Sequence, residues 1–542
     1  MMTRYLAQLS LLLALACVIP ARLLLAEVSP RSLESLVIQE GGRKKPYLVF
    51  TEETLRSLSG KTALTLDGQK KDALTVITGL WMSPDDSWKG KELILVSNRP
   101  LRQQIGIDPV RKLYSWNELS SNEALAKEIT AAAAVRRRDP KAKLMGIQKE
   151  ASDVGMRMGL FEELLKGADF KIIAPLSGSD WLTSAQIDPS EGKAIIDSVD
   201  SMHTAWRASD PNRFDQATQT LLSLQKQVGG LPPDWKISLE IAYQKSHPFR
   251  WAWILYAAAG IILLLSRNSW ERLGYQLAWV LAGSGFLLQA GGLLSRVLIA
   301  GRPPVTNMYE SVIWVAFGTI LFALIFEAIY RAGSFLLGAV PVAVASLILA
   351  DSQPVILDHS IHPLTPVLRD NFWLSTHVLS ITLSYAAFAL SLGVAHVALA
   401  QVIAGRKPTA ILYTYLYKAL QVGVLLLATG TILGGVWANY SWGRFWDWDP
   451  KETWALTALL GYLFLLHGRI SGLWGGFGLA VGSVIAFMSV LMAWYGVNFV
   501  LGAGLHSYGF GTGGFPLVAA FVGCEILFVS IAFLRKRQSS GL

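Results

Sequence analysis

The sequence predicts a mostly α, polytopic helical membrane protein of about nine spans, preceded by an N-terminal membrane anchor or signal and an α+β extracytoplasmic domain. Two observations support this fold class. Only 16% of the 542 residues are charged, whereas about a quarter is usual for soluble proteins. The deficit is concentrated in residues 250–535, whose apolar runs approach or exceed the roughly 20 residues that a helix needs to cross a bilayer.

Two segments precede these apolar runs. Residues 1–26 hold an apolar stretch that predicts a retained anchor, because Leu24 fits poorly near a cleavage site. A cleaved signal is the second alternative, and a lipoprotein signal, from the run Ala14-Leu-Ala before Cys17, is the third. Residues 27–248 have mixed charges, short apolar or alternating stretches and helical stretches, which predict a mixed α+β domain. These stretches are Tyr47–Phe50, Leu93–Val96 and Lys171–Pro175, then Glu123–Arg138 and Gly155–Leu165. This domain contains no catalytic motif, and its position suggests that it docks a partner.

The apolar runs of residues 249–542 predict the spans. They are Arg250–Leu265, Leu273–Ile299, Met308–Tyr330, Ser334–Ala350, Trp373–Ala404, Leu420–Trp437, Thr453–Leu466, Leu473–Asn498 and Phe515–Leu534. With the basic C-terminus placed in the cytoplasm, Arg267, Arg331, Arg406 and Arg469 all fall on the cytoplasmic side, as the positive-inside rule requires. We therefore expect a multi-pass protein of a bacterial-type inner membrane, with residues 27–248 on the outer, periplasmic side.

Charge and cysteine content exclude several classes of protein. The net charge of +9 arises largely in short loops and at the C-terminus, where membrane topology explains it, so no nucleic-acid partner is expected. The two cysteines, Cys17 and Cys524, lie in separate apolar runs and form no C-x-x-C pair. The chain is therefore neither a c-type cytochrome itself nor a dithiol redox protein.

Residues 437–454, called the Trp loop below, are predicted to lie on the outer side between two spans. They contain five tryptophans interleaved with three acidic residues, namely Trp437, Trp442, Trp446, Trp448 and Trp454 with Asp447, Asp449 and Glu452. An aromatic belt at a membrane interface accounts for one or two of these rings but not for all of them. A flat polyaromatic surface suits a flat aromatic ligand such as a porphyrin, because the rings can stack on its faces.

Four cations predicted on the outer side depart from the positive-inside pattern: Arg302, Arg369, Arg444 and Lys451. A porphyrin carries two propionates, and a guanidinium is a good bidentate partner for a carboxylate. We expect Arg302, Arg444 and Lys451 to pair with the propionates, which would explain their position.

The run Trp442-Gly-Arg-Phe-Trp-Asp-Trp-Asp-Pro-Lys-Glu452 resembles the WWD domain of the haem-handling family that includes CcsA/ResC, CcmC and CcmF. Pro304–Ser311 and Trp373–Val378 resemble stretches typical of CcsA, and the resemblance covers roughly residues 250–535. It implies a system II cytochrome c-type biogenesis protein. The candidate haem-binding residues of the loop are Trp442, Arg444, Trp446, Trp448, Asp449 and Glu452. Residues 27–248 depart from the short CcsA pattern and do not obviously resemble the CcsB/ResB partner.

His377 and His506 are the candidate iron ligands. Both are predicted on the side of the Trp loop, and two neutral imidazoles could fill the axial positions of one haem iron. In the family, histidines at these matching places flank the WWD loop and bind external haem. His467, near the cytoplasmic end of the next span, matches a family histidine thought to receive haem on its way out. The alternatives are an interfacial polar histidine for His377 and His506, and a solvated helix end for His467.

Other histidines receive weaker assignments. His396 follows His377 by nineteen residues on one predicted helix, about 28 Å at 1.5 Å per residue, so the two cannot share an iron. It could pair with His467, but a packed, hydrogen-bonded histidine is favoured. His359 and His362 could bind a metal, although a solvated loop is the better interpretation.

Together these features predict haem transport to the outer face and covalent attachment of the haem to an apocytochrome c with a CxxCH segment. Haem b would be a transient substrate, and a CcsB/ResB-like membrane subunit would be a partner. The chain would then act as a holocytochrome c synthase whose catalysis arises mainly from the proximity and orientation of the reactants. The acidic residues of the Trp loop could orient it, move protons, or form salt bridges with Arg444 and Lys451. Alternative functions are a haem exporter or chaperone without synthase activity, and an electron-transfer subunit with permanent b-type haems.

Overall fold

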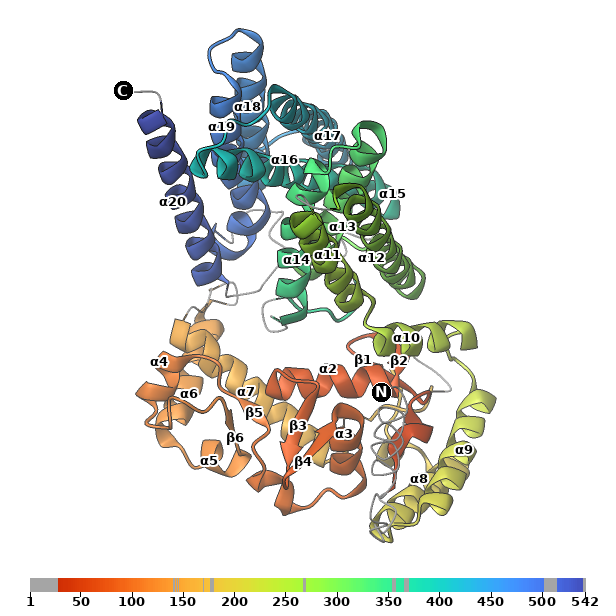
Figure 1. The fold of residues 1–542 in the computed structure, drawn as a ribbon. Helices are drawn as coiled ribbons and strands as arrows, with labels where there is room; N and C mark the ends of the chain where they lie inside the picture. The colour runs from red at the N-terminus through yellow and green to blue at the C-terminus, as the bar shows by residue number, and fades with distance from the viewer. Residues whose placement is uncertain are drawn as a thin grey trace, which may run out of the picture. The chain divides into compact units, whose positions relative to one another are not determined.

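The computed structural model describes residues 28–139, 142, 144, 146–168, 170–175, 180–266, 270–352, 357–364, 370–501 and 514–539. The chain divides after Pro232 into two compact units, within the run Gly229-Gly-Leu-Pro-Pro233 (Figure 1). The predicted anchor or signal in residues 1–26 and the candidate ligand His506 both lie outside the described residues.

The first unit combines short antiparallel strand pairs with helices, as predicted. The pairs are β1 (Val37–Glu40) with β2 (Arg43–Pro46), β3 (Ala63–Leu66) with β4 (Gln69–Asp72), and β5 (Ile94–Leu95) with β6 (Leu113–Tyr114). The helices are η1 (Pro30–Leu33), α2 (Tyr47–Ser59), α3 (Ala73–Met82), η2 (Asp86–Gly90), α4 (Arg99–Gln104), α5 (Trp116–Ser120), α6 (Glu123–Arg138), α7 (Gly146–Leu165), η3 (Ser184–Gln186), α8 (Pro189–Arg207) and α9 (Pro211–Val228).

The stretch Tyr47–Phe50 forms the first turn of α2 and not a strand. Its four apolar or aromatic residues look strand-like alone, but buried Thr54, Leu55 and Leu58 extend the pattern at helical spacing. Lys171–Pro175 contributes only an isolated bridge between Ile173 and Leu182. Glu123–Arg138 is helical as expected.

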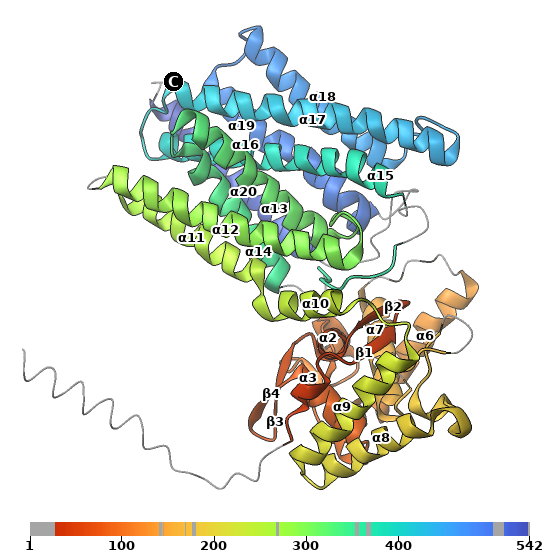
Figure 2. The same ribbon diagram turned by 90° about the vertical axis from the view of Figure 1, so that its right-hand side faces the viewer.

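The second unit is a bundle of long apolar helices. Within the described residues, nine helical segments are long and apolar enough to cross a membrane, which confirms the predicted spans. Figure 2 shows α11, α12, α13, α16 and α17 running along one another. The helices are α10 (Asp234–Ser246), α11 (Pro248–Leu265), α12 (Glu271–Ala300), α13 (Met308–Tyr330), α14 (Ser334–Ser352), α15 (Asn371–Trp373), α16 (Leu379–Ile403), α17 (Ala410–Trp442), α18 (Pro450–Ile470), α19 (Gly476–Leu491) and α20 (Phe515–Ser539), with π-helices η6 (Leu374–Val378) and η7 (Met492–Leu501).

Helix α17 is longer than its predicted span, because the tyrosine-containing residues 410–419 and 438–442 continue the helix beyond the apolar run at both ends. Its 33 residues correspond to about 50 Å, against a hydrocarbon layer of about 30 Å. The helix ends at Gly443, which adopts a left-handed conformation at φ 72°. The end of the bundle at which residues 443–449 connect α17 to α18 is called the loop end below.

Buried glutamates anchor both ends of α13. Near the loop end, Glu310 accepts hydrogen bonds from the backbone N–H and hydroxyl of Thr306, at 2.9 and 2.7 Å. At the other end, Glu327 accepts from the backbone N–H groups of Gly333 and Phe335, at 2.8 and 2.9 Å. Each carboxylate thus satisfies donors of an adjoining loop or helix start, which fixes the connections on either side of α13.

Helices α14 and α16 approach closely where Gly338 faces Gly393. A Cβ built on Gly393 would lie 2.0 Å from the Gly338 carbonyl oxygen, a clash with backbone that no rotamer change can relieve. We expect Gly393→Ala to destabilise the bundle by about 1–3 kcal/mol or more. Thermal unfolding of the purified protein in detergent measures this loss.

Gly461 on α18 is the matched control, because its added Cβ would meet nothing within 4 Å. Gly461→Ala should leave the melting temperature unchanged or raise it, since alanine is the better helix former. Equal melting temperatures for the two variants would contradict the proposed backbone contact.

Candidate functional site

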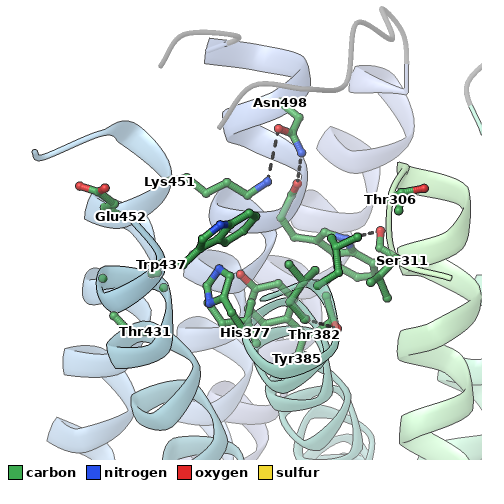
Figure 3. Close-up of a pocket in the computed structure, with 18 of the residues that line it drawn as sticks. Thr306, Ser311, His377, Thr382, Tyr385, Thr431, Trp437, Lys451, Glu452 and Asn498 are labelled. Atoms are coloured by element: carbon green, nitrogen blue, oxygen red, sulfur yellow. Dashed lines mark hydrogen bonds between the residues drawn. The ribbon is translucent and has the colours of Figure 1, made fainter. Parts of the chain in front are cut away.

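A cavity of about 200 Å³ opens at the loop end of the bundle. Its walls come from the start of α13, the junction of η6 and α16, the end of α17, the start of α18, and η7 (Figure 3). Most lining residues are apolar or aromatic: they include Val305, Met308, Leu374, Tyr385, Trp437, Phe445, Trp446, Trp494 and Phe499. The polar and charged lining residues include His377, Lys451, Glu452 and Asn498. The cavity therefore combines aromatic surfaces with one histidine and a few polar groups, an arrangement typical of a ligand site.

Two π-helical segments face this cavity. η6 carries His377, and η7 carries Trp494 and Asn498. π-helical turns are rare and occur mostly at functional sites, because the extra residue per turn redirects side chains out of the ordinary helical register. Their presence on two walls marks the cavity independently of the Trp loop.

His377 is oriented by a backbone acceptor on α17. Its Nδ1 lies 2.8 Å from the Gly430 carbonyl oxygen. Because a carbonyl only accepts, Nδ1 bears the proton and Nε2 carries the lone pair in the neutral ring. The ring also lies 5.6 Å from that of Trp437, whose own ring stacks on Trp373 at 6.5 Å and 11°. The described residues contain no group of three or more His, Cys, Asp or Glu side chains that could hold a metal ion.

The Trp loop divides into residues that line the cavity and residues that do not. Trp437 and Trp446 line it. Trp448 is 69% exposed and adopts a positive φ of 57°, while its ring meets that of Trp446 edge-on at 6.0 Å. Trp442 forms the end of α17, where Arg444 lies over its ring at 5.6 Å. Trp454 packs against the bundle core.

The acidic residues of the loop form its scaffold. Asp449 is the N-cap of α18, with Pro450 in the first turn, and its side chain accepts from Lys451 N at 2.9 Å. Glu452 completes the capping box and also accepts from Asp447 N at 2.9 Å. Helix capping was not among the roles expected for these residues from the sequence. The spacing Asp449-Pro-Lys-Glu452 was a readable helix-start signal in the sequence.

The three cations of the loop end differ in their surroundings. Arg302 is buried and donates to the His362 carbonyl at 2.8 Å, which fixes it to a neighbouring loop. Arg444 lies 3.4 Å from Asp447 and 3.7 Å from Glu452. Lys451 lines the cavity, and its Nζ lies 3.5 Å from Asn498 Oδ1 (Figure 3). Lys451 therefore supplies the positive charge of the cavity wall.

The Pro304–Ser311 stretch forms the wall opposite the Trp loop. Val305, Thr306, Asn307 and Ser311 line the cavity, and Ser311 accepts from Trp494 Nε1 at 2.9 Å. Behind them, Arg296 and Glu310 form a fully buried ion pair at 2.7 Å.

The guanidinium of this ion pair also binds two further segments of the chain. Arg296 also donates to the His359 carbonyl at 2.9 Å and to Tyr243 Oη at 3.2 Å. Distributing one buried guanidinium over several acceptors offsets its desolvation and joins helices α10, α12 and α13.

Among the described residues, the other candidate histidines are not part of the cavity lining. His467 is exposed near the end of α18 remote from the loop end, with its Nδ1 2.8 Å from the Leu463 carbonyl. His396 pairs with Glu525 of α20 at 3.0 Å and with the Leu392 carbonyl at 2.8 Å, so it has the packed, hydrogen-bonded environment that was favoured. His362 pairs with Asp358 at 2.8 Å.

Several cavity residues were not found from the sequence. Trp494, Asn498 and Tyr385 lie inside apolar runs that predict spans and nothing more. Asn498, a polar residue within a span, was the one available signal, because such residues commonly mark function.

Known proteins are similar to this chain in part of its sequence. A family model described as "Cytochrome C assembly protein" matches residues 305–506. The protein NrfI of Wolinella succinogenes is 31% identical over 527 residues, which is 89% of this chain and 54% of that protein. The cytochrome c biogenesis protein CcsA of Prochlorococcus marinus subsp. pastoris is 36% identical over 256 residues, 42% of this chain and 81% of the relative. CcsA of Guillardia theta is 33% identical over 244 residues, 40% and 79% of the two chains. The chain thus spans about half the length of NrfI.

Two substitutions of Asp449 can test whether this residue stabilises the start of α18 by capping it. Asp449→Ala should lower stability by about 0.5–2 kcal/mol, while Asp449→Ser, which retains an N-cap acceptor, should keep most of it. Thermal unfolding in detergent measures both. A serine variant as unstable as the alanine variant would argue against the capping role.

Proposed function

Because this chain belongs to the CcsA family of cytochrome c biogenesis proteins, we propose that it holds haem b beside His377 and presents it for covalent attachment to an apocytochrome c. The observation that carries the proposal is the aromatic cavity at the loop end, with His377 held in one tautomer at its wall. His377 would bind the iron through Nε2. His506, outside the described residues, remains the predicted second ligand.

The cavity suits one part of a porphyrin and not the whole molecule. Its volume of about 200 Å³ is below the range of about 300–1,000 Å³ usual for drug-sized ligands. A porphyrin inserted beside Trp437 and Trp446 would therefore project from the cavity. A projecting edge is what the reaction needs, because the vinyl groups must meet a protein segment that comes from outside.

Lys451 is the best candidate to bind a propionate. It stands at the first turn of α18, where the helix dipole also favours an anion. Arg444 and Arg302 are the secondary candidates, since Arg444 faces two carboxylates and Arg302 donates to a carbonyl. An anchored propionate would orient the opposite, vinyl-bearing edge toward the exterior.

The attachment reaction needs no group beyond the two reactants and the correct state of the iron. Each cysteine thiol of the CxxCH segment adds across a vinyl double bond. The sulfur bonds to the carbon next to the ring, and the thiol hydrogen ends on the terminal carbon. The protein contributes orientation and proximity, which are worth several kcal/mol of the barrier when both partners are held in reactive geometry.

The wider arrangement is also part of the proposal. The loop end would face the outer side of a bacterial-type inner membrane, as the positive-inside rule predicts. His467, at the other end of α18, would lie on the route by which haem enters. A CcsB/ResB-like membrane subunit is the expected partner, and residues 28–232 are the proposed docking unit for a further protein.

The two alternative functions differ in their demands on the structure. An electron-transfer subunit with permanent haems would use histidine pairs within the spans, whereas His396 faces Glu525. A haem exporter would use the same cavity without making thioether bonds, so only the covalent product distinguishes it from a synthase.

Co-expression with an apocytochrome c and a CcsB/ResB-like subunit tests the synthase function. We expect haem that resists acid-acetone extraction, and a large loss of it in His377→Gly. His362→Gly is the control, because this exposed histidine pairs with Asp358 and does not line the cavity. Haem export without any covalent product, with all partners present, would favour the exporter.

The role of Lys451 is testable with two forms of the ligand. Lys451→Gln should weaken haem binding about 10–100-fold, as expected for loss of a charged hydrogen bond worth about 1.5–3 kcal/mol. Haem dimethyl ester lacks the carboxylates, so the variant and the unmodified protein should bind it equally. A loss of the same size with both ligands would contradict the propionate contact.

A further inference from the structure

We propose that Gly434 is a positioning residue for His377. By lacking a side chain, it admits the imidazole to the Gly430 carbonyl, and this contact selects the ring nitrogen available to the iron. The inference rests on the proposed function, because it assumes that His377 binds haem. It adds a residue on α17 that neither the Trp loop nor the ligand set includes.

The space beside Gly434 is filled by the His377 ring. A Cβ built on Gly434 would lie 2.5 Å from Cε1 of His377, 2.9 Å from Nδ1 and 3.2 Å from Nε2. Carbon atoms of two residues in van der Waals contact do not approach each other to 2.5 Å, so any side chain at this position would displace the ring.

The spacing of Gly430 and Gly434 explains why the displacement matters. In an α-helix, side chains tilt toward the N-terminus, so the Cβ of one residue lies above the carbonyl four positions earlier. Gly434 stands four residues after Gly430, whose carbonyl accepts the Nδ1 hydrogen bond at 2.8 Å. A methyl group at residue 434 would therefore obstruct the path along which the imidazole reaches its acceptor.

The hydrogen bond determines which nitrogen can bind a metal. Nδ1 donates to the carbonyl, so the neutral ring offers its lone pair at Nε2. A backbone acceptor on the second nitrogen also raises the basicity of a histidine ligand and fixes the plane of its ring. Loss of such second contacts typically costs about 10–100-fold in metal affinity.

A packing glycine on the same helix provides a matched control. A Cβ on Gly423 would lie 2.5 Å from Phe388 Cε1, between α17 and α16. The two glycines thus present clashes of equal size with aromatic rings, but the atoms nearest the Gly423 Cβ all belong to Phe388 and not to the histidine ring. A general loosening of the helix pair should follow from both substitutions, whereas a specific effect on His377 should follow from one.

The experiment compares Gly434→Ala and Gly423→Ala, each in the unmodified protein and in His377→Gly. Purified proteins in detergent are titrated with haem and followed by absorption and electron paramagnetic resonance spectra. Gly434→Ala should lower haem affinity at least tenfold and change the spectrum, and Gly423→Ala should do neither. In the His377→Gly background, Gly434→Ala should have no further effect, because the ring with which it clashes is absent.

Thermal unfolding of the same four variants gives a second readout. The destabilisation by Gly434→Ala should be relieved in the His377→Gly background, while that by Gly423→Ala should persist. Equal affinity losses from Gly434→Ala in both backgrounds, or a melting loss that His377→Gly does not relieve, would overturn the positioning role alone. Failure of the unmodified protein to bind haem would overturn the proposed function, and this inference with it.

Discussion

The hydrogen bond from His377 to the Gly430 carbonyl joins η6 to helix α17 at the point where the candidate site is built. It holds the ring against Trp437 and sets the tautomer of a neutral histidine. The residues around it serve this geometry: the π-helical turn of η6 redirects His377 from the α-helical register, and Gly434 leaves space for the ring. A rigid ligand of this kind is expected where a protein must hold a metal chelate in one orientation.

The walls of the cavity are held by buried polar interactions on opposite sides. Arg296 and Glu310 secure the stretch before α13, and Asp449 with Glu452 secures the start of α18. A buried ion pair contributes little net stability, because desolvation offsets the attraction between its charges. The ion pair and the helix cap both fix the geometry of their loops, since each accepts hydrogen bonds from backbone or hydroxyl donors that would otherwise lack partners.

The sequence was sufficient for the spans, because the hydrophobic requirement of a bilayer is strong and local. It also singled out His377, Trp446 and Glu452, which line the cavity. It could not tell which rings face inward, because that depends on the left-handed turn at Gly443 and the positive φ of Trp448. The contributions of Trp494 and Gly434 were equally hidden, since π-helical register and close contacts between distant helices have no local sequence signature. Tyr47–Phe50 was read only as a short apolar stretch, because a window of four residues does not reveal the helical period of α2.

The proposed position of haem, in the cavity at the loop end with its iron bound by His377, can be tested with an experimental structure of the haem-loaded protein. We expect iron within bonding distance of His377 Nε2, a propionate beside Lys451, and the vinyl edge directed out of the cavity. Haem bound elsewhere on the bundle, or in this cavity with its iron away from His377, would rule out His377 as the iron ligand of this site.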